Sequence, residues 1–167
     1  ESMLSGSWWC HDIDHTLRVH DLCLKIGEIE NADLEVLELA ALLHDIGRPK
    51  EMETKGKICH AEYGSKLARS FLEEERYDND KIEQVVYCIS THRSRRWKAP
   101  ETLEWKILYD ADKLDCIWAV WIGRAFMYAW EIGAKLHNDK WVDVANTETY
   151  SRDDTEYREY LVKLRYI

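Results

Sequence analysis

The stretch Leu34–Leu43, followed at once by His44 and Asp45, places the tightest limits on how this chain folds. Its apolar residues recur at spacings of three and four, the period of a helix with one buried face. Asp33 is a favourable N-cap before it, and Gly47-Arg48-Pro49 is a conventional helix stop after it. Consecutive helical residues project about 100° apart, so one cation beside the helix can collect both polar side chains. Other helices then have to supply the remaining ligands.

The same periodicity runs through most of the chain, with no strand pattern, repeat or low-complexity tract. The sequence therefore predicts an all-α, single-domain bundle. Asp80 is expected to cap the helix that follows the break at 78–80. Helices are expected over about 12–28, 34–43, 60–72 and 80–92, then a segment over 103–108, a long apolar helix that ends near Leu136, and a last helix over about 155–164, with 48–59 and 138–154 as loops.

Three more histidines fall on the buried faces or at the ends of these helices. His15 lies one turn before Val19 on the apolar stripe of the first helix, and His60 opens the third helix. His92 continues the stripe that Ile89 belongs to, at the end of the fourth helix. A polar group buried without a partner is costly, so each of these histidines needs one.

A carboxylate from the group Asp110, Asp112 and Asp115 is the sixth candidate ligand. Asp112 and Asp115 are three residues apart and share one face, in what we expect to be the first turn of the long apolar helix. Six such groups inside one bundle are better explained by a shared metal than by six separately satisfied hydrogen bonds. Mixed imidazole and carboxylate ligands suit Mn, Fe, Co, Ni or Zn, with Mg as an alternative.

Basic residues follow two of these candidate ligands. Arg93, Arg95 and Arg96 come directly after His92, and Lys50 and Lys57 lie in the 48–59 loop. Arginine pairs bidentately with phosphate oxygens, so this pattern favours phosphate recognition. The alternatives are a solvated helix end and a solvated loop.

Composition limits the partners and the compartment. The chain has 23 basic and 32 acidic residues, a net charge of −9, which argues against broad nucleic-acid or membrane binding. No apolar run approaches the roughly 18 residues that cross a bilayer. The five cysteines are widely spaced without a Cys-x-x-Cys pair, which predicts reduced thiols in a cytoplasmic protein. The long helix is rich in tryptophan, which leaves a homodimer open.

The ordered set of His15, the doublet His44-Asp45 and the later Asp112 resembles the HD superfamily of metal-dependent phosphohydrolases. The similarity runs from about His11 to Tyr128, and its extended phrases are those around His44, around His60 and from Ile107 to Asp115. These phrases resemble those of one branch of the superfamily, which includes bacterial nucleoside triphosphate pyrophosphohydrolases. We accordingly expect a lead-in over 1–10, an HD domain over 11–137, and a C-terminal extension over 138–167 whose last helix packs on the same domain.

The resemblance implies a helical bundle with the metal site in its interior. It selects Asp112 as the carboxylate ligand, with one tight metal on His15, His44, Asp45 and Asp112. His60 and His92 would hold a second metal or act as acid–base groups. Lys113, together with the basic residues above, would contact the phosphate of the substrate. His11 and Asp115 would contact the metal ligands without binding the metal themselves.

The expected reaction is hydrolysis of a nucleoside triphosphate to monophosphate and pyrophosphate by a metal-activated water. A nucleotide is then the small-molecule partner. The alternatives on the same site are a nucleoside monophosphate phosphatase or a phosphodiesterase. Less favoured are a di-iron oxygenase and a nucleotide-binding module without turnover.

Overall fold

The computed structural model describes residues 13–93, 101–117 and 119–162, and every regular element in these ranges is helical. The all-α prediction is confirmed. By its contacts the chain divides into two compact units, Glu1–Asp112 and Lys113–Ile167. The predicted domain boundary near residue 137 stays a prediction. The elements are α1 (Ile13–Glu30), α2 (Leu34–Leu43), α3 (Arg48–Glu53), α4 (His60–Glu74), α5 (Asn79–Thr91), α6 (Leu103–Asp115), α7 (Ala119–Glu131), the short 3-10 helix η1 (Val144–Asn146) and α8 (Glu156–Val162).

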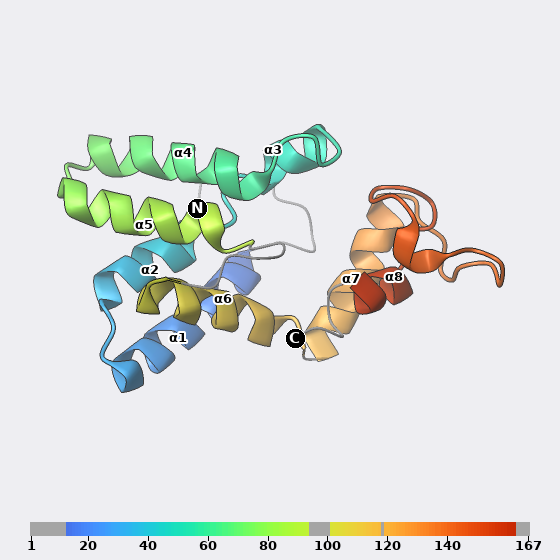
Figure 1. Cartoon of the computed structure of the whole chain (residues 1–167), viewed down its shortest axis with the longest axis horizontal. Helices are drawn as coiled ribbons and strands as arrows, with labels where there is room; N and C mark the ends of the chain where they lie inside the picture. The colour runs from blue at the N-terminus through green and yellow to red at the C-terminus, as the bar shows by residue number, and fades with distance from the viewer. Residues whose placement is uncertain (1–12, 94–100, 118, 163–167) are drawn as a thin grey trace. The chain divides into compact units, whose positions relative to one another are not determined.

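The first unit is built from two helical pairs that share a core. Helices α4 and α5 lie side by side, as do α1 and α2, and α2 also packs on α5 (Figure 1). Trp105 of α6 is fully buried in the same core and packs edge-on against Tyr87 of α5, with ring centroids 5.7 Å apart. The apolar stripes found in the sequence supply the rest of this core, among them Val19, Val36 and Ile89. The six candidate ligands all lie in this unit.

Two helix starts are set by aspartate side chains. Asp33 caps α2 as predicted, because its Oδ1 accepts hydrogen bonds from the backbone N–H groups of Glu35 and Val36. The prediction that Asp80 caps α5 is wrong by two residues. Asp78 is the N-cap, and its side chain accepts from the backbone N–H of Asp80.

The segment after Asp45 differs from the predicted helix stop and loop. Gly47 has φ −84° and ψ −7°, a right-handed helical conformation, so the chain turns directly into the six-residue helix α3. Pro49 lies in its first turn, where a missing N–H costs nothing. The space around Gly47 explains why glycine stands there. A Cβ at this position would lie 2.2 Å from the His60 carbonyl oxygen and 2.8 Å from the Gly64 nitrogen.

The predicted long helix from Tyr109 to Leu136 is in fact two helices. Asp112 and Asp115 lie at the C-terminal end of α6 rather than in the first turn of the following helix. Helix α7 begins at Ala119 and ends at Glu131 because Gly133 takes φ +73°, the left-handed conformation that closes many helices. The Ala134 N–H then bonds back to the Ala129 carbonyl at 2.8 Å.

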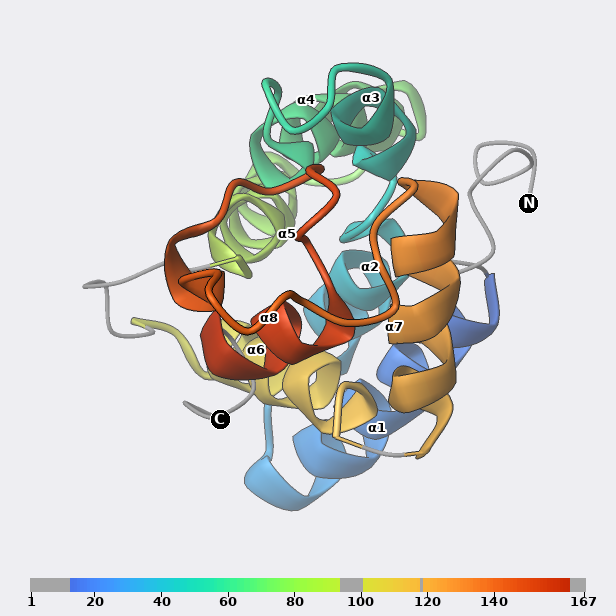
Figure 2. The same cartoon turned by 90° about the vertical axis from the view of Figure 1, so that its right-hand side faces the viewer.

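The second unit contains α7, η1 and α8, with α8 packed on both of the others (Figure 2). Its loops are held by a buried ion pair. Arg158 of α8 donates to Asp154 at 3.0 Å and to the Thr147 carbonyl at 2.8 Å. Residues 163–164 of the predicted last helix lie outside the described residues.

Two further sequence predictions can be compared with the described ranges. Cys23, Cys59, Cys88 and Cys116 are all free thiols, while Cys10 lies outside these ranges. None of the helices within the described residues combines the length and hydropathy needed to span a membrane.

Candidate metal centre

Three of the predicted ligands meet where α1, α2 and α6 converge, and we call them the first triad: His15, His44 and Asp112. All three are buried, with exposed fractions of 1%, 0% and 8%. His15 comes from the buried stripe of α1, and His44 is the C-cap of α2 in helical geometry. The His15 Nε2 lies 3.4 Å from the His44 Nε2 and 3.5 Å from an Asp112 carboxylate oxygen. Ligand atoms at these separations can share one cation.

The other three ligands form the second triad: Asp45, His60 and His92. They are also buried, at 5%, 0% and 1% exposure. His60 opens α4 and His92 closes α5, so the helical pair α4/α5 brings both rings to one end of the unit. Their Nε2 atoms are 3.2 Å apart, and the His60 Nε2 lies 3.3 Å from Asp45 Oδ1. The two histidines that the sequence left with two roles therefore share a carboxylate.

The carboxylate of Asp45 also joins the two triads. Its Oδ1 faces His60 and His92, at 3.3 and 3.8 Å from their Nε2 atoms. Its Oδ2 faces His15 and His44, at 3.8 and 3.7 Å. One oxygen is therefore directed to each group of imidazoles. The residues present would fit either one cation at the first triad or one cation at each triad.

Backbone carbonyls fix the tautomers of two histidines. The His44 Nδ1 lies 2.7 Å from the Ala41 carbonyl oxygen, and the His92 Nδ1 lies 2.6 Å from the Ile89 carbonyl oxygen. A carbonyl oxygen can only accept, so each ring donates a proton from Nδ1. The Nε2 of each ring faces the carboxylate of Asp45. Metal-binding histidines are held in this way by groups behind them.

The electrostatics of the second triad fit a bound cation. Burial, with the charge of Arg48, lowers the pKa of His60 to about 4 against the opposing hydrogen bond to Glu51. Burial, with the neighbouring His60 and His44, holds the pKa of His92 well below its ordinary value. Both rings are therefore neutral near pH 7. Two neutral rings that face each other through bare nitrogens repel, whereas a divalent transition metal between them would use both lone pairs.

Sequence reasoning missed two residues that hold this centre together, Arg48 and Glu51. Arg48 Nε donates to Asp45 Oδ1 at 2.9 Å, and its Nη1 donates to Glu51 Oε2 at 3.1 Å. Glu51 is only 2% exposed, although the sequence placed it in a solvated loop. Residues 45, 48 and 51 are spaced by three, the separation of neighbours on a helix. That spacing was the available signal, and it was hidden because the segment looks like a charged loop.

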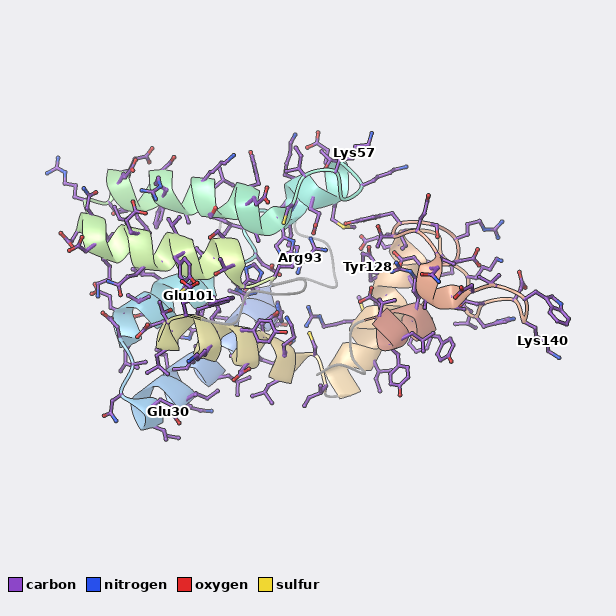
Figure 3. The ribbon with its side chains drawn as sticks, viewed as in Figure 1. Glu30, Lys57, Arg93, Glu101, Tyr128 and Lys140 are labelled. Atoms are coloured by element: carbon purple, nitrogen blue, oxygen red, sulfur yellow. The ribbon has the colours of Figure 1, made fainter. Side chains whose placement is uncertain are left out.

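The predicted phosphate contacts are placed unevenly. Arg93 lies just past α5, and its Nη1 donates to Glu51 Oε1 at the edge of the second triad (Figure 3). Lys50 donates instead to Glu53 at 2.8 Å, on the exposed side of α3. Lys57 is exposed in the loop between α3 and α4. Of these three cations, only Arg93 is held beside the ligands.

The remaining predicted site residues are outside the described residues or belong to the second compact unit. Arg95, Arg96 and His11 are outside the described residues. Lys113 belongs to the second compact unit. Asp115 is buried there, and its Oδ2 accepts a hydrogen bond from Arg124 at 2.7 Å. The roles assigned to these five residues stay predictions.

Comparison with known proteins adds a family match and several close structures. The HD domain family model matches residues 12–117. The uncharacterized protein YpgQ of Bacillus subtilis is 36% identical over 141 residues, or 84% of this chain and 67% of YpgQ. A predicted HD superfamily hydrolase from an uncultured Thermotogales bacterium is 33% identical, with a TM-score of 0.64 over 99% of this chain and 85% of that chain. B. subtilis YpgQ in complex with ADP is 32% identical, with a TM-score of 0.62 over 98% of this chain and 89% of that chain. The span 12–117 contains both triads.

Proposed function

Because this chain belongs to the HD domain family and is a metal-dependent hydrolase, we propose that it hydrolyses nucleotides, converting a nucleoside triphosphate to monophosphate and pyrophosphate. The observation that carries the proposal is the pair of buried triads that share the carboxylate of Asp45. A nucleotide substrate is further supported by the ADP in the crystal structure of YpgQ, which is 32% identical. Arg93 at the edge of the second triad supplies a cation for phosphate oxygens.

The geometry supports the following residues as those that would hold the metal. His15, His44 and Asp112 face one another with Asp45 Oδ2 beside them, and would bind one divalent transition metal. His60 and His92 lie on the other side of Asp45 and would bind a second one. A divalent metal bound there would supply a water ligand of lowered pKa and a positive charge for a phosphoryl oxygen.

The side chains around the triads hold the ligands in place. Arg48 donates to Asp45 Oδ1 and so fixes the plane of the carboxylate that both triads use. The carbonyls of Ala41 and Ile89 hold the protons of His44 and His92 on Nδ1, away from the carboxylates. Rings fixed this way are better ligands than proton donors. A pyrophosphate leaving group needs little protonation, so the proposed reaction does not require His92 to act as an acid.

Metal analysis of the purified protein and a panel of nucleotides test the proposal together. The panel should contain nucleoside mono-, di- and triphosphates and a phosphodiester, with phosphate and pyrophosphate release measured separately. We expect pyrophosphate from triphosphates and at least one metal per chain. The matched control is Asp45→Asn, which keeps the side-chain shape and removes the shared charge.

Other results would redirect or refute the proposal. Phosphate release from monophosphates alone would identify a nucleotidase, and cleavage of the diester alone would identify a phosphodiesterase. Nucleotides that bind and stay intact after long incubation with Mn²⁺ would refute hydrolysis of nucleotides.

A further inference from the structure

Glu51 of α3 is a buried carboxylate in a helix whose other acidic residue is exposed. Its Oε2 lies 2.7 Å from the His60 Nδ1 and 3.1 Å from the Arg48 Nη1, while its Oε1 accepts from Arg93. The carboxylate therefore accepts from three donors, the imidazole of His60 and the guanidinium groups of Arg48 and Arg93.

The position of His60 at the start of its helix explains why it needs such an acceptor. His44 and His92 come at helix ends, and each donates its Nδ1 proton to a carbonyl three residues earlier in its own helix. His60 is the first residue of α4, so no helical carbonyl precedes it. Its acceptor has to come from another element, and Glu51 of α3 occupies that place.

The proton on His60 can be assigned from the distances. Arg93 Nη1 also lies near the His60 Nδ1, at 3.2 Å, but it is a donor only. The shorter contact, 2.7 Å, is to the carboxylate of Glu51, whose two oxygens also accept from the donors Arg48 and Arg93. The Nδ1 must therefore donate to Glu51, which leaves the His60 Nε2 with its lone pair toward Asp45 and His92.

We propose that Glu51 is the positioning residue of the second triad: its carboxylate fixes the tautomer and orientation of His60, and Arg48 and Arg93 hold that carboxylate in place. A carboxylate behind a metal-binding imidazole also makes the ring a stronger ligand than a carbonyl does. Since Arg48 bonds to Asp45 as well, one ion-pair network orients two of the three members of this triad. The inference rests on the proposed function only in treating His60 as a metal ligand.

Charge balance gives Glu51 a second effect on the same site. Its carboxylate is the partner of two guanidinium groups, Arg48 and Arg93, that lie close to the proposed cation. Without it, one negative charge is lost and the two guanidinium groups face the metal ligands with less compensation. Both the orientation of His60 and the local charge therefore lead to weaker metal binding when Glu51 is removed.

The test compares Glu51→Gln and Glu51→Ala with the control Glu53→Gln. Glu53 lies in the same helix, but its side chain is 68% exposed and pairs with Lys50. The tautomer of His60 is read from long-range proton–nitrogen NMR correlations of the histidine rings in the metal-free protein. Zn²⁺ affinity is measured by competition with a chelator. Neither measurement needs a substrate.

We expect the control to match the wild type in both measurements. Glu51→Gln should keep the proton on His60 Nδ1, because the amide oxygen still accepts, and should weaken Zn²⁺ binding about tenfold. Glu51→Ala should give a mixture of tautomers and weaken Zn²⁺ binding toward about a hundredfold.

Retention of both the tautomer and the Zn²⁺ affinity in Glu51→Ala would overturn the proposal, even if the variant melted at a lower temperature. If Glu51→Ala does not fold, unchanged Zn²⁺ affinity in Glu51→Gln would overturn it. A protein that hydrolyses no nucleotide but shows the expected changes would refute the proposed function and leave the role of Glu51 standing.

Discussion

Replacing Gly47 with alanine should destabilise the first compact unit and disturb the second triad. The backbone of Gly47 is in the ordinary helical region, at φ −84° and ψ −7°, so alanine suffers no conformational strain there. The added Cβ, however, would lie 2.2 Å from the His60 carbonyl oxygen and 2.8 Å from the Gly64 nitrogen. Both are backbone atoms of α4, so relief requires α3 and α4 to separate by about 1 Å.

The expected loss of unfolding free energy in Gly47→Ala follows from two opposing effects. Overpacking of this kind costs about 1–3 kcal/mol, whereas the loss of glycine entropy in the unfolded chain returns only about 0.4–1 kcal/mol. The net loss of unfolding free energy should therefore be about 1–2 kcal/mol. For a unit of this size, that corresponds to a fall in Tm of roughly 4–10 °C.

The matched control is Gly123→Ala. Gly123 lies inside α7, and a Cβ there meets no atom within 4 Å. This substitution should stabilise its helix by up to about 1 kcal/mol. Thermal melting followed by far-UV circular dichroism measures both variants, and Zn²⁺ affinity shows whether His60 has moved. An unchanged or higher Tm for Gly47→Ala, with unchanged Zn²⁺ affinity, would refute the close approach of α3 to α4.

Three further substitutions or reactions test other parts of the structure. Asp33→Ala should lower the free energy of unfolding in urea at pH 7 by about 1 kcal/mol, while Asp33→Asn should keep the cap of α2. Equal losses of unfolding free energy in the two variants would contradict the capping role. A hydrogen bond from Lys81 lowers the pKa of Asp33, against the opposing effect of burial. The loss of unfolding free energy in Asp33→Ala should therefore be complete above about pH 4, and it should shrink as the pH falls through the folded-state pKa of Asp33. Burial raises the pKa of the Cys88 thiol to about 12, so iodoacetamide at pH 8 should label Cys59 well before Cys88, as judged by peptide mass spectrometry, and the reverse order would be inconsistent with the buried thiol. Asp45→Asn should retain about a tenth or less of the wild-type metal, and full retention would contradict the shared carboxylate.

The buried ligands were predictable because helical periodicity ties local sequence to the side that a residue faces. His15 sits one turn before the core residue Val19, and His92 continues the stripe of Ile89; both are 1% exposed in the folded unit. The same reasoning predicted that His60 opens a helix. These inferences need only the 3.6-residue repeat and the cost of burying polar groups.

Periodicity failed where the elements are short or the pattern is continuous. Helix α3 has six residues and hardly any apolar side chain, so its buried Glu51 could not be told from a solvated charge. The apolar stretch after Tyr109 reads as one helix, although α6 ends at Asp115 and α7 ends near Gly133. Charge pairing decided the burial of Glu51, and backbone conformation decided where the helices end. Neither produces a periodic pattern in the sequence.

By itself, the sequence determined that His15 and His92 lie on buried helical stripes and that His44 and Asp45 follow the end of a core helix. The tertiary structure decided how the ligands are grouped: one oxygen of Asp45 faces His15 and His44, and the other faces His60 and His92. That grouping depends on how helices far apart in the sequence cross, and on the close approach of backbones that Gly47 allows. Such contacts are set by packing between helices, which the repeat within any one helix does not encode.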